Sequence, residues 1–167
     1  MVIRQATTLD IDNFYELFVE IMNEGYAGYS EALKTHFLTK DYTKINYYNW
    51  IEKFFRIIYL AIEGEKIVGF ISGDYTYGGI GFVSWLGVKK EFRGKGIGKK
   101  LYLTYEDFAN KKGAHLIELY TYPEVADFYI RLGFNKIGER KQGYFGQKNI
   151  IMNKKLRDWS DEYLATR

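Results

Sequence analysis

The feature that most constrains this chain is a glycine-rich, basic turn between a strand pattern and a helix pattern. The apolar strand pattern ends at Val88, and an amphipathic helix pattern follows Gly94, Gly96 and Gly98. Because glycine adopts backbone angles closed to other residues, such a turn can aim several N–H groups into one concavity. The N-terminus of the next helix adds partial positive charge. The turn therefore predicts a binding site for a phosphate-bearing anion.

The charges around the turn support this prediction. The formal net charge of +3 is too small by itself to indicate a nucleic-acid partner. Six cations nevertheless fall within twelve residues, against the single acid Glu91. They are Lys89, Lys90, Arg93, Lys95, Lys99 and Lys100. A run of this kind alone is typical of a solvated face, but beside the glycines it favours anion binding.

Two common phosphate-binding motifs do not match this turn. The Walker pattern requires glycine where Arg93 stands, and Ser or Thr where Lys100 stands. The dinucleotide fingerprint Gly-x-Gly-x-x-Gly requires glycine where Lys99 stands. Glu118 lies at the distance of that fingerprint's ribose-binding acid, but it falls inside a strand pattern. Both motifs are therefore excluded.

Two ordered motifs resemble those of one known family. Arg93, Gly96 and Gly98 form an Arg-x-x-Gly-x-Gly pattern, and residues 126–134 read Ala-Asp-Phe-Tyr-Ile-Arg-Leu-Gly-Phe. Together they resemble the acetyl-CoA signature and the Phe-Tyr, Gly-Phe segment of the GCN5-related N-acetyltransferases (GNAT). The resemblance is specific between about residues 80 and 134 and generic toward both ends.

The hydrophobic patterns predict an α/β fold. They predict strands at 2–6, 57–63, 66–77, 80–88, 116–120, 134–142 and 148–156. They predict helices from Thr8 or Asp10, within 29–56, over 96–112 and from Pro123 to about Gly133. One helix within 29–56 is expected to carry Tyr47, Trp50, Phe54 and Phe55. The resemblance implies a mixed, mostly antiparallel central sheet with flanking helices, whose strands ending at Val88 and starting near His115 splay at the cofactor site.

Length and composition indicate one globular domain. The 167 residues, 47% of them hydrophobic, are enough for a single core, so we expect one domain over 1–167. The acetyl-CoA core would span about 80–134, with 157–167 as a peripheral tail. Neither a membrane-length apolar run nor a signal peptide is visible, so a cytoplasmic protein without a membrane partner is expected. A monomer or homodimer is expected.

The absence of cysteine limits the chemistry. With zero cysteines there can be no disulfide, zinc-thiolate site or cysteine nucleophile. Acetyl transfer through an acetyl-cysteine is therefore excluded, and direct transfer to an amine is expected. His36 and His115 are isolated in the sequence, and no metal site is expected.

The resemblance implies where acetyl-CoA binds. Unpaired backbone groups at Leu86 and Val88 would hold the pantetheine arm, and the turn would bind the pyrophosphate. The full predicted set is Leu86, Val88, Arg93, Gly94, Lys95, Gly96, Ile97, Gly98 and Lys99. Many family members have Asn three residues before the alanine at the position of Ala126, where this chain has Pro123. Thr121, Tyr122 or the helix N-terminus would have to replace that cofactor contact.

Two catalytic residues are predicted. Tyr129 matches the family tyrosine that can protonate the departing sulfur, although it can also be one more core aromatic. Glu118 interrupts an apolar strand and is carried forward as the general base, with Asp74 or a bound water as alternatives. A strand acid that merely faces solvent would have the same pattern.

The acceptor is predicted from two aromatic segments, about 22–50 and 143–146. Tyr26, Tyr29, Tyr144 and Phe145 would form an aromatic rim. The pair Tyr144-Phe145 is similar to the paired tyrosines of protein N-terminal acetyltransferases. An α-amine also has a pKa near 8, which leaves more neutral amine at pH 7 than a lysine near 10.4.

Two alternative functions remain open, and a third is ranked last. Small polyamines could use Glu20, Glu24 and Glu31 as partners. A non-catalytic acyl-CoA sensor would bind cofactor without acetylating an amine. An RNA-binding module is not expected, because Phe92 is the one aromatic residue close to the basic cluster in sequence.

Overall fold

The computed structural model describes residues 1–25 and 29–162. These residues group into two compact units. The first holds residues 1–72 and 85–104, and the second holds 73–84 together with the chain from 105 onward. The single domain expected from length stays a prediction, and each unit is described by itself.

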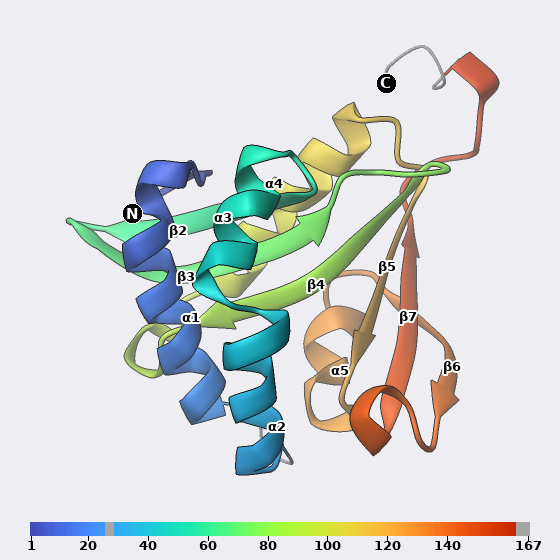
Figure 1. Ribbon diagram of the computed structural model, residues 1–167. Coiled ribbons are helices and arrows are strands. Elements are labelled where there is room, and N and C mark those ends of the chain that lie inside the picture. Colours follow the sequence, from blue (N-terminus) through green and yellow to red (C-terminus); the bar gives the residue numbers. More distant parts are fainter. Residues whose placement is uncertain (26–28, 163–167) are drawn as a thin grey trace. The chain divides into compact units, whose positions relative to one another are not determined.

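Seven strands of the described chain form one hydrogen-bonded sheet in the order β1-β2-β3-β4-β5-β7-β6 (Figure 1). Their bounds are β1 Val2–Gln5, β2 Arg56–Glu63, β3 Lys66–Asp74, β4 Ile80–Val88, β5 Leu116–Thr121, β6 Asn135–Arg140 and β7 Asn149–Lys155. β1 with β2, β5 with β7 and β6 with β7 are antiparallel, whereas β4 and β5 are parallel. The expected mixed, mostly antiparallel sheet is confirmed.

The helices follow the predicted order, and the one or two helices expected within 29–56 are two. Their bounds are α1 Ile11–Gly25, α2 Glu31–His36, α3 Lys44–Glu52, α4 Ile97–Lys111 and α5 Pro123–Ile130. Shorter turns are Thr8–Asp10, Lys90–Phe92 and Tyr144–Gly146, which are 3-10 helical, and the π-helical Phe37–Asp41. The segment between α1 and β2 thus holds two helices, because Ser30 and Thr43 each cap a separate one.

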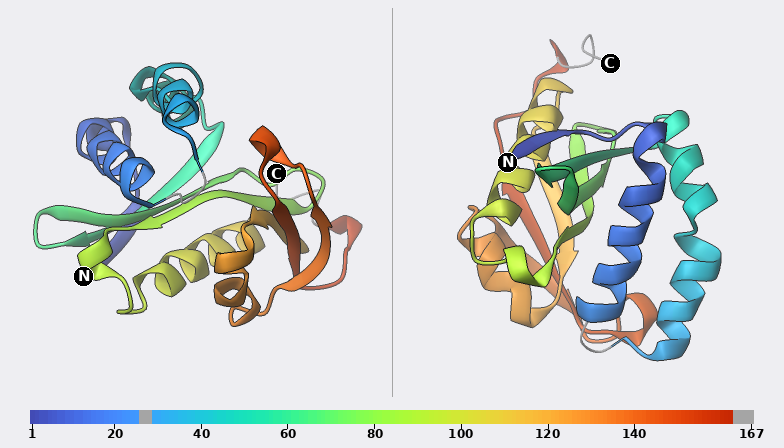
Figure 2. Two further views of the ribbon diagram at one scale, coloured as in Figure 1. Left: turned by 90° about the horizontal axis from the view of Figure 1, so that it is seen from below. Right: turned by 90° about the vertical axis from the view of Figure 1, so that its left-hand side faces the viewer.

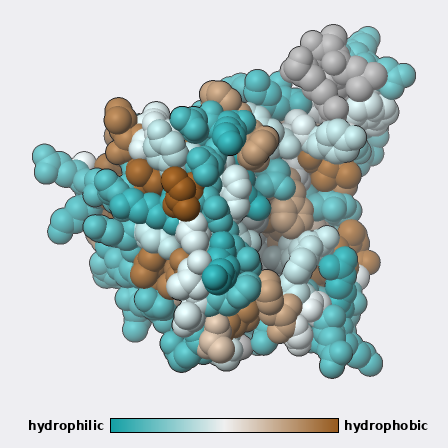
Figure 3. All heavy atoms as spheres, viewed as in Figure 1, coloured by the Kyte–Doolittle hydropathy of each residue, from teal (hydrophilic) through white to brown (hydrophobic). Residues whose placement is uncertain are grey.

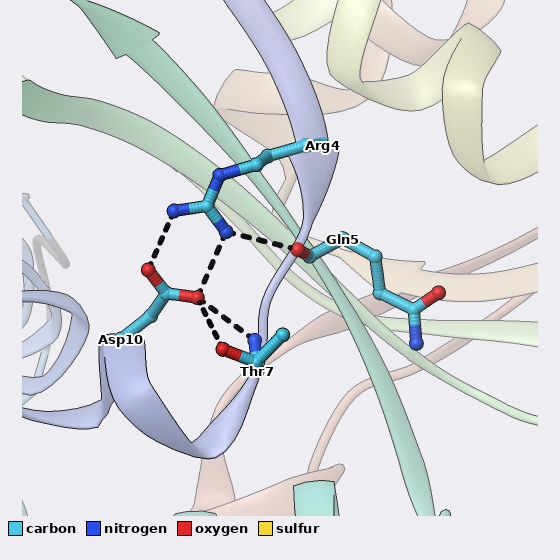
Figure 4. A network of polar contacts seen from close by, with 4 residues as sticks. All are labelled: Arg4, Gln5, Thr7 and Asp10. Carbon is cyan, nitrogen blue, oxygen red and sulfur yellow. Dashed lines mark hydrogen bonds and ion pairs between the residues drawn. The ribbon is translucent and has the colours of Figure 1, made fainter.

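The start of α1 is fixed by a polar network in the first unit (Figure 4). The Arg4 guanidinium donates two hydrogen bonds to the Asp10 carboxylate, at 2.6 and 2.8 Å. The same carboxylate accepts from the backbone N–H of Thr7 at 2.8 Å and from its hydroxyl at 3.0 Å. Because Arg4 lies on β1, the network ties the edge strand to the entrance of the helix.

The core of the first unit is aromatic and lies where α1, α2 and α3 cover one face of its strands (Figure 2). Phe14 and Phe18 of α1 are fully buried. Trp85 of β4 contacts Phe18 and Tyr42, with ring centroids 5.8 and 5.2 Å apart. A Cβ at Gly87 would lie 2.9 Å from Ile21, so α1 packs directly on the end of β4. This contact supports the strand that leads into the glycine turn.

The predicted helix does not extend to Phe54 and Phe55, so its predicted C-terminal end is wrong. α3 stops at Glu52, and the N–H of Phe55 donates to the carbonyl of Trp50 at 2.9 Å. Phe54 takes a left-handed φ of 55°, which ends the helix as a residue at this position commonly does. Phe54 and Phe55 are consequently 66% and 64% exposed.

In the second unit, β5 pairs with β4 from Ile80–Leu116 to Val83–Leu119, and with β7 along its whole length. The final turns of α4 and the helix α5 cover one face of this sheet (Figure 2). Lys154 of β7 reaches Glu106 of α4 at 2.6 Å on that face. The expected splay of β4 from β5 involves residues of both units and stays a prediction.

The two faces of β5 differ, as strand alternation requires. Ile117, Leu119 and Thr121 are buried, while Glu118 and Tyr120 are half-buried on the opposite face.

On the side of the molecule drawn in Figure 3, hydrophobic residues form separate spots among hydrophilic ones.

Candidate functional site

The glycine turn has the backbone geometry that the sequence predicts. Gly94 and Gly96 have φ values of 76° and 78°, in the left-handed region. An added Cβ at either position would meet nothing within 4 Å. These glycines are therefore required by backbone conformation rather than by lack of space. Gly98 lies in the first turn of α4 and is part of the helix rather than of the turn before it.

The turn also presents free backbone donors. The first hydrogen bond of α4 joins the N–H of Lys100 to the carbonyl of Gly96 at 3.1 Å. The N–H groups of residues 97–99 therefore precede the helical ladder. Within the described chain, the N–H groups of Gly94, Lys95 and Gly96 donate no backbone hydrogen bond either. These donors, at the positive end of a 15-residue helix, suit an anion.

The predicted cations surround this turn. Lys90, Arg93, Lys95, Lys99 and Lys100 are exposed. Lys89 is half-buried instead, because its ammonium pairs with Glu20 of α1 at 2.6 Å. Buried Ile97 anchors the helix start in the core.

One predicted cofactor contact needs correction. The carbonyl of Val88 is not unpaired, because it accepts a hydrogen bond from Nε of Arg93 at 2.8 Å. A carbonyl can accept a second hydrogen bond, so the roles of Leu86 and Val88 toward pantetheine stay predictions. Arg93 itself folds back onto the end of β4 and thereby braces the turn.

Tyr129 lies in an aromatic setting in the second unit. It is 8% exposed, and its ring centroid lies 5.0 Å from that of Phe128 and 5.6 Å from that of Phe134. Burial raises the pKa of its hydroxyl above the ordinary value. Within the described chain the hydroxyl makes no hydrogen bond, so its proton is available to a ligand.

Glu118 lies on the half-open face of β5. Its cross-strand neighbours are Phe82 of β4 and Asn153 of β7. Its half-burial fits a base as well as a solvent-facing strand acid, so its role stays a prediction. Pro123 occupies the first turn of α5, with Tyr122 as the residue before the helix.

The predicted acceptor residues lie in different settings. Tyr144 and Phe145 are exposed, at 56% and 50%, on the hairpin between β6 and β7. Asn149 holds this hairpin, because its buried side-chain oxygen accepts from the N–H of Tyr144 at 2.9 Å. Tyr29 is half-buried against Phe37, with ring centroids 5.4 Å apart. Tyr26 lies outside the described residues.

Two residues that the sequence analysis did not select lie beside Tyr144 in the second unit. The ring of Tyr120 lies 5.5 Å from that of Tyr144 and 5.2 Å from that of Phe82. The guanidinium of Arg140 lies 5.0 Å from the Tyr120 ring and 6.0 Å from the Tyr144 ring. Strand alternation could have placed Tyr120 beside Glu118, but no local pattern indicates the position of Arg140.

Comparison with known proteins decides the family. A model of the acetyltransferase (GNAT) family matches residues 13–134. The chain belongs to this family. The resemblance predicted from the two motifs is thereby confirmed. Matching proteins are named N-acetyltransferases, and one of them was crystallised in complex with coenzyme A.

Two curated proteins and one solved structure show how similar this acetyltransferase is to known proteins. A protein of Methanocaldococcus jannaschii named an uncharacterized N-acetyltransferase is 28% identical over 144 residues, which are 80% of this chain and 60% of that relative. The N-alpha-acetyltransferase 30 of Schizosaccharomyces pombe is 29% identical over 104 residues, which are 58% of this chain and 69% of that protein. The crystal structure of the PaiA N-acetyltransferase of Thermoplasma acidophilum with coenzyme A matches with a TM-score of 0.78 at 25% identity, covering 93% of this chain and 99% of that one.

The chain thus spans less than two thirds of the length of the Methanocaldococcus relative, so the activity of the whole protein is treated below as a proposal.

The residues of the glycine turn fit a pyrophosphate, since left-handed glycines, free N–H groups and cations converge there. Among the described residues, no helix is long and apolar enough to cross a membrane.

Proposed function

We propose that this acetyltransferase transfers acetyl directly to the α-amine of a peptide or protein N-terminus. The observation that carries the proposal is the exposed aromatic pair Tyr144-Phe145, held on a braced hairpin. Such rings can clamp a peptide backbone while remaining open to solvent. The N-alpha-acetyltransferase among the relatives supports an acceptor of this class.

The glycine turn would hold the cofactor. The N–H groups from Gly94 to Gly98 would bind the pyrophosphate of coenzyme A, with Lys95, Lys99 and the helix N-terminus balancing its charge. The N–H of Arg93, the first residue of the predicted set, already donates to the carbonyl of Lys90 at 3.2 Å. The backbone at Leu86 and Val88 would pair with the pantetheine amides. Bound acetyl-CoA supplies the thioester whose acetyl group is transferred.

The chemistry requires two proton movements. A neutral amine attacks the acetyl carbonyl carbon, so a C–N bond forms and the C–S bond breaks. Tyr129 would donate its hydroxyl proton to the departing sulfur, and burial helps to keep that proton in place. Glu118, directly or through a water, would accept the proton that the amine releases. A thiol has a pKa near 8.5, and burial holds the pKa of Tyr129 above the ordinary phenol value near 10. Because proton donation from so weak an acid to a thiolate is unfavourable, we expect the contribution of Tyr129 to be modest.

The ion pairs of the described chain favour this acceptor over a polyamine. A polyamine site would need free carboxylates, and Glu20, Glu24 and Glu31 are the candidates near the acceptor segment. Glu20 is paired with Lys89 at 2.6 Å, and Glu31 with Lys34 at 2.9 Å. Two of the three carboxylates are therefore already engaged.

A thiol-release assay with acetyl-CoA tests the proposal. The panel contains peptides with free N-termini, lysine peptides with blocked N-termini, spermidine and an aminoglycoside. Turnover confined to the free N-termini is expected. Turnover confined to spermidine would overturn the acceptor assignment, and binding of acetyl-CoA without any turnover would indicate an acyl-CoA sensor. The cytoplasmic location and the oligomeric state stay predictions.

A further inference from the structure

We propose that Arg140 binds a carboxylate of the acceptor, so that the protein prefers N-termini with an acidic side chain at the first or second position. This inference rests on the proposed function, whose acceptor class it narrows. It concerns the second unit alone and is carried by an aromatic cluster of Phe82, Tyr120 and Tyr144, in which Phe82 meets Tyr120 edge-on and Tyr120 is tilted against Tyr144.

Two rings of this aromatic cluster, Tyr120 and Tyr144, contact the Arg140 guanidinium. The group lies 5.0 Å from the centroid of the Tyr120 ring and 6.0 Å from that of Tyr144. Contact with aromatic rings holds a guanidinium by its face and leaves the N–H donors at its edge for other partners. Those donors match the two oxygens of a carboxylate. Arg140 is therefore pre-oriented although it is exposed.

No carboxylate of the described chain occupies these donors. The nearest acid in sequence, Glu139, accepts from Lys136 at 2.6 Å and lies 3.4 Å from the ammonium of Lys148. Arg140 itself makes no ion pair with any residue in the described part of the chain. Arg140 thus contacts two aromatic rings and, among the described residues, no carboxylate.

The charge of the residues around Arg140 also favours an acidic acceptor. Residues 135–149 carry four cations and one acid. The cations are Lys136, Arg140, Lys141 and Lys148, and the acid is Glu139. A surface of this sign attracts acidic peptides and disfavours basic ones, and salt screens the effect.

The position of Arg140 connects this charge to the proposed acceptor site. Tyr144, one of the two rings beneath it, belongs to the aromatic pair proposed to clamp the peptide. Tyr120, the other ring, lies two residues from Glu118 on the same face of β5. A carboxylate bound by Arg140 would therefore belong to a residue close to the reacting amine.

Peptide kinetics test the inference. The acceptors begin Ser-Glu, Ser-Gln, Ser-Lys, Glu-Ser or Gln-Ser and are amidated at the C-terminus, so that the only variable carboxylate is the side chain. We expect kcat/KM for the best acidic peptide to exceed that of its amide counterpart about fivefold at low salt, the size of an exposed charge-assisted contact.

Arg140→Gln should abolish this preference, so that the Glu and Gln peptides react at equal rates. Lys141→Gln is the matched control, because it removes the same charge from the adjacent residue, which is exposed and has no contact with either tyrosine. The control should keep the preference. Peptide binding measured by calorimetry without acetyl-CoA gives a readout that does not depend on turnover.

The possible outcomes separate the two proposals. Turnover of N-terminal peptides with equal rates for Glu and Gln, or equal loss of preference in both variants, would overturn the role of Arg140 alone. No turnover of any peptide would overturn the proposed function, and the inference would fail with it. Arg140→Glu should reverse the order of the Glu and Lys peptides, a result that a merely structural role would not produce.

Discussion

Glu20 of α1 and Lys89, the first residue after β4, form an ion pair of 2.6 Å at the edge of the glycine turn. The pair withholds one cation of the basic cluster from a bound phosphate. It also places a carboxylate close to the predicted anion site. The N–H of Lys89 donates to the carbonyl of Val68 at 2.9 Å, so the backbone at this position is fixed independently of the ion pair.

Loss of the Glu20 carboxylate should strengthen coenzyme A binding. In Glu20→Gln the ammonium of Lys89 is free, and the negative charge near the turn is gone, so we expect about a threefold lower Kd at low salt. The Kd is measured by calorimetry at two salt concentrations, and the difference should shrink at high salt. Glu31→Gln removes a comparable exposed pair as a control. Weaker binding in Glu20→Gln would show that the pair positions the turn instead.

Substitution of Gly96 should weaken cofactor binding without unfolding the protein. Gly96→Val forces a β-branched residue to a φ of 78°, so the turn must rearrange. We expect at least a tenfold loss in coenzyme A affinity with a single cooperative unfolding transition. Gly64→Val is the matched control, since Gly64 has a φ of 61° in the turn between β2 and β3 and equally open surroundings. Equal affinity in wild type and Gly96→Val would contradict the site.

Removal of the Tyr129 hydroxyl should cost a modest part of the rate. We expect Tyr129→Phe to lower kcat about three- to tenfold, with the KM for acetyl-CoA unchanged, because a phenol helps a thiolate only slightly. Burial raises the pKa of Tyr129, so the wild-type rate should not fall between pH 8 and about pH 10 through loss of its proton. Tyr75→Phe, at a half-buried tyrosine outside the proposed site, serves as the control. Wild-type turnover of Tyr129→Phe throughout that range would leave Tyr129 as a core residue.

The Asp10 network should make stability depend on pH in acid. Hydrogen bonds from Arg4, then from Thr7, lower the pKa of Asp10 from 3.8 to about 2. Because the folded-state pKa is the lower one, the stabilisation is complete above about pH 4 and is lost as the pH falls toward 2. We expect Asp10→Asn to lower the free energy of unfolding by about 1 kcal/mol at pH 7, allowing for solvent exposure of Arg4.

Urea denaturation of wild type and Asp10→Asn at pH 7, 4 and 2.5 measures this difference. The gap between the two proteins should narrow as the pH falls. Asp12→Asn, which removes the exposed pair of Asp12 with Lys44, is the control and should change stability little. A constant gap across the three pH values would mean that Asp10 acts through packing rather than charge.

The amino-acid sequence by itself determined the features that depend on neighbouring residues. The glycine turn was predictable because left-handed backbone angles at Gly94 and Gly96 exclude most side chains, and the strand before it and the helix after it have clear periodicities. The resemblance to the family rested on two such local motifs and implied acetyl-CoA as the co-substrate. The boundary of α3 was not predictable, because the left-handed turn at Phe54 needs no glycine and has no sequence signal.

Only the tertiary structure decided which distant side chains meet. Glu20 and Lys89 are 69 positions apart, and their ion pair exists because α1 packs on β4. Tyr120, Arg140 and Tyr144 come from β5, β6 and the following hairpin. They lie in contact because β7 pairs with both β5 and β6. Contacts of this kind depend on strand register and helix packing, which are properties of the whole fold. The composition of any single segment therefore could not reveal them.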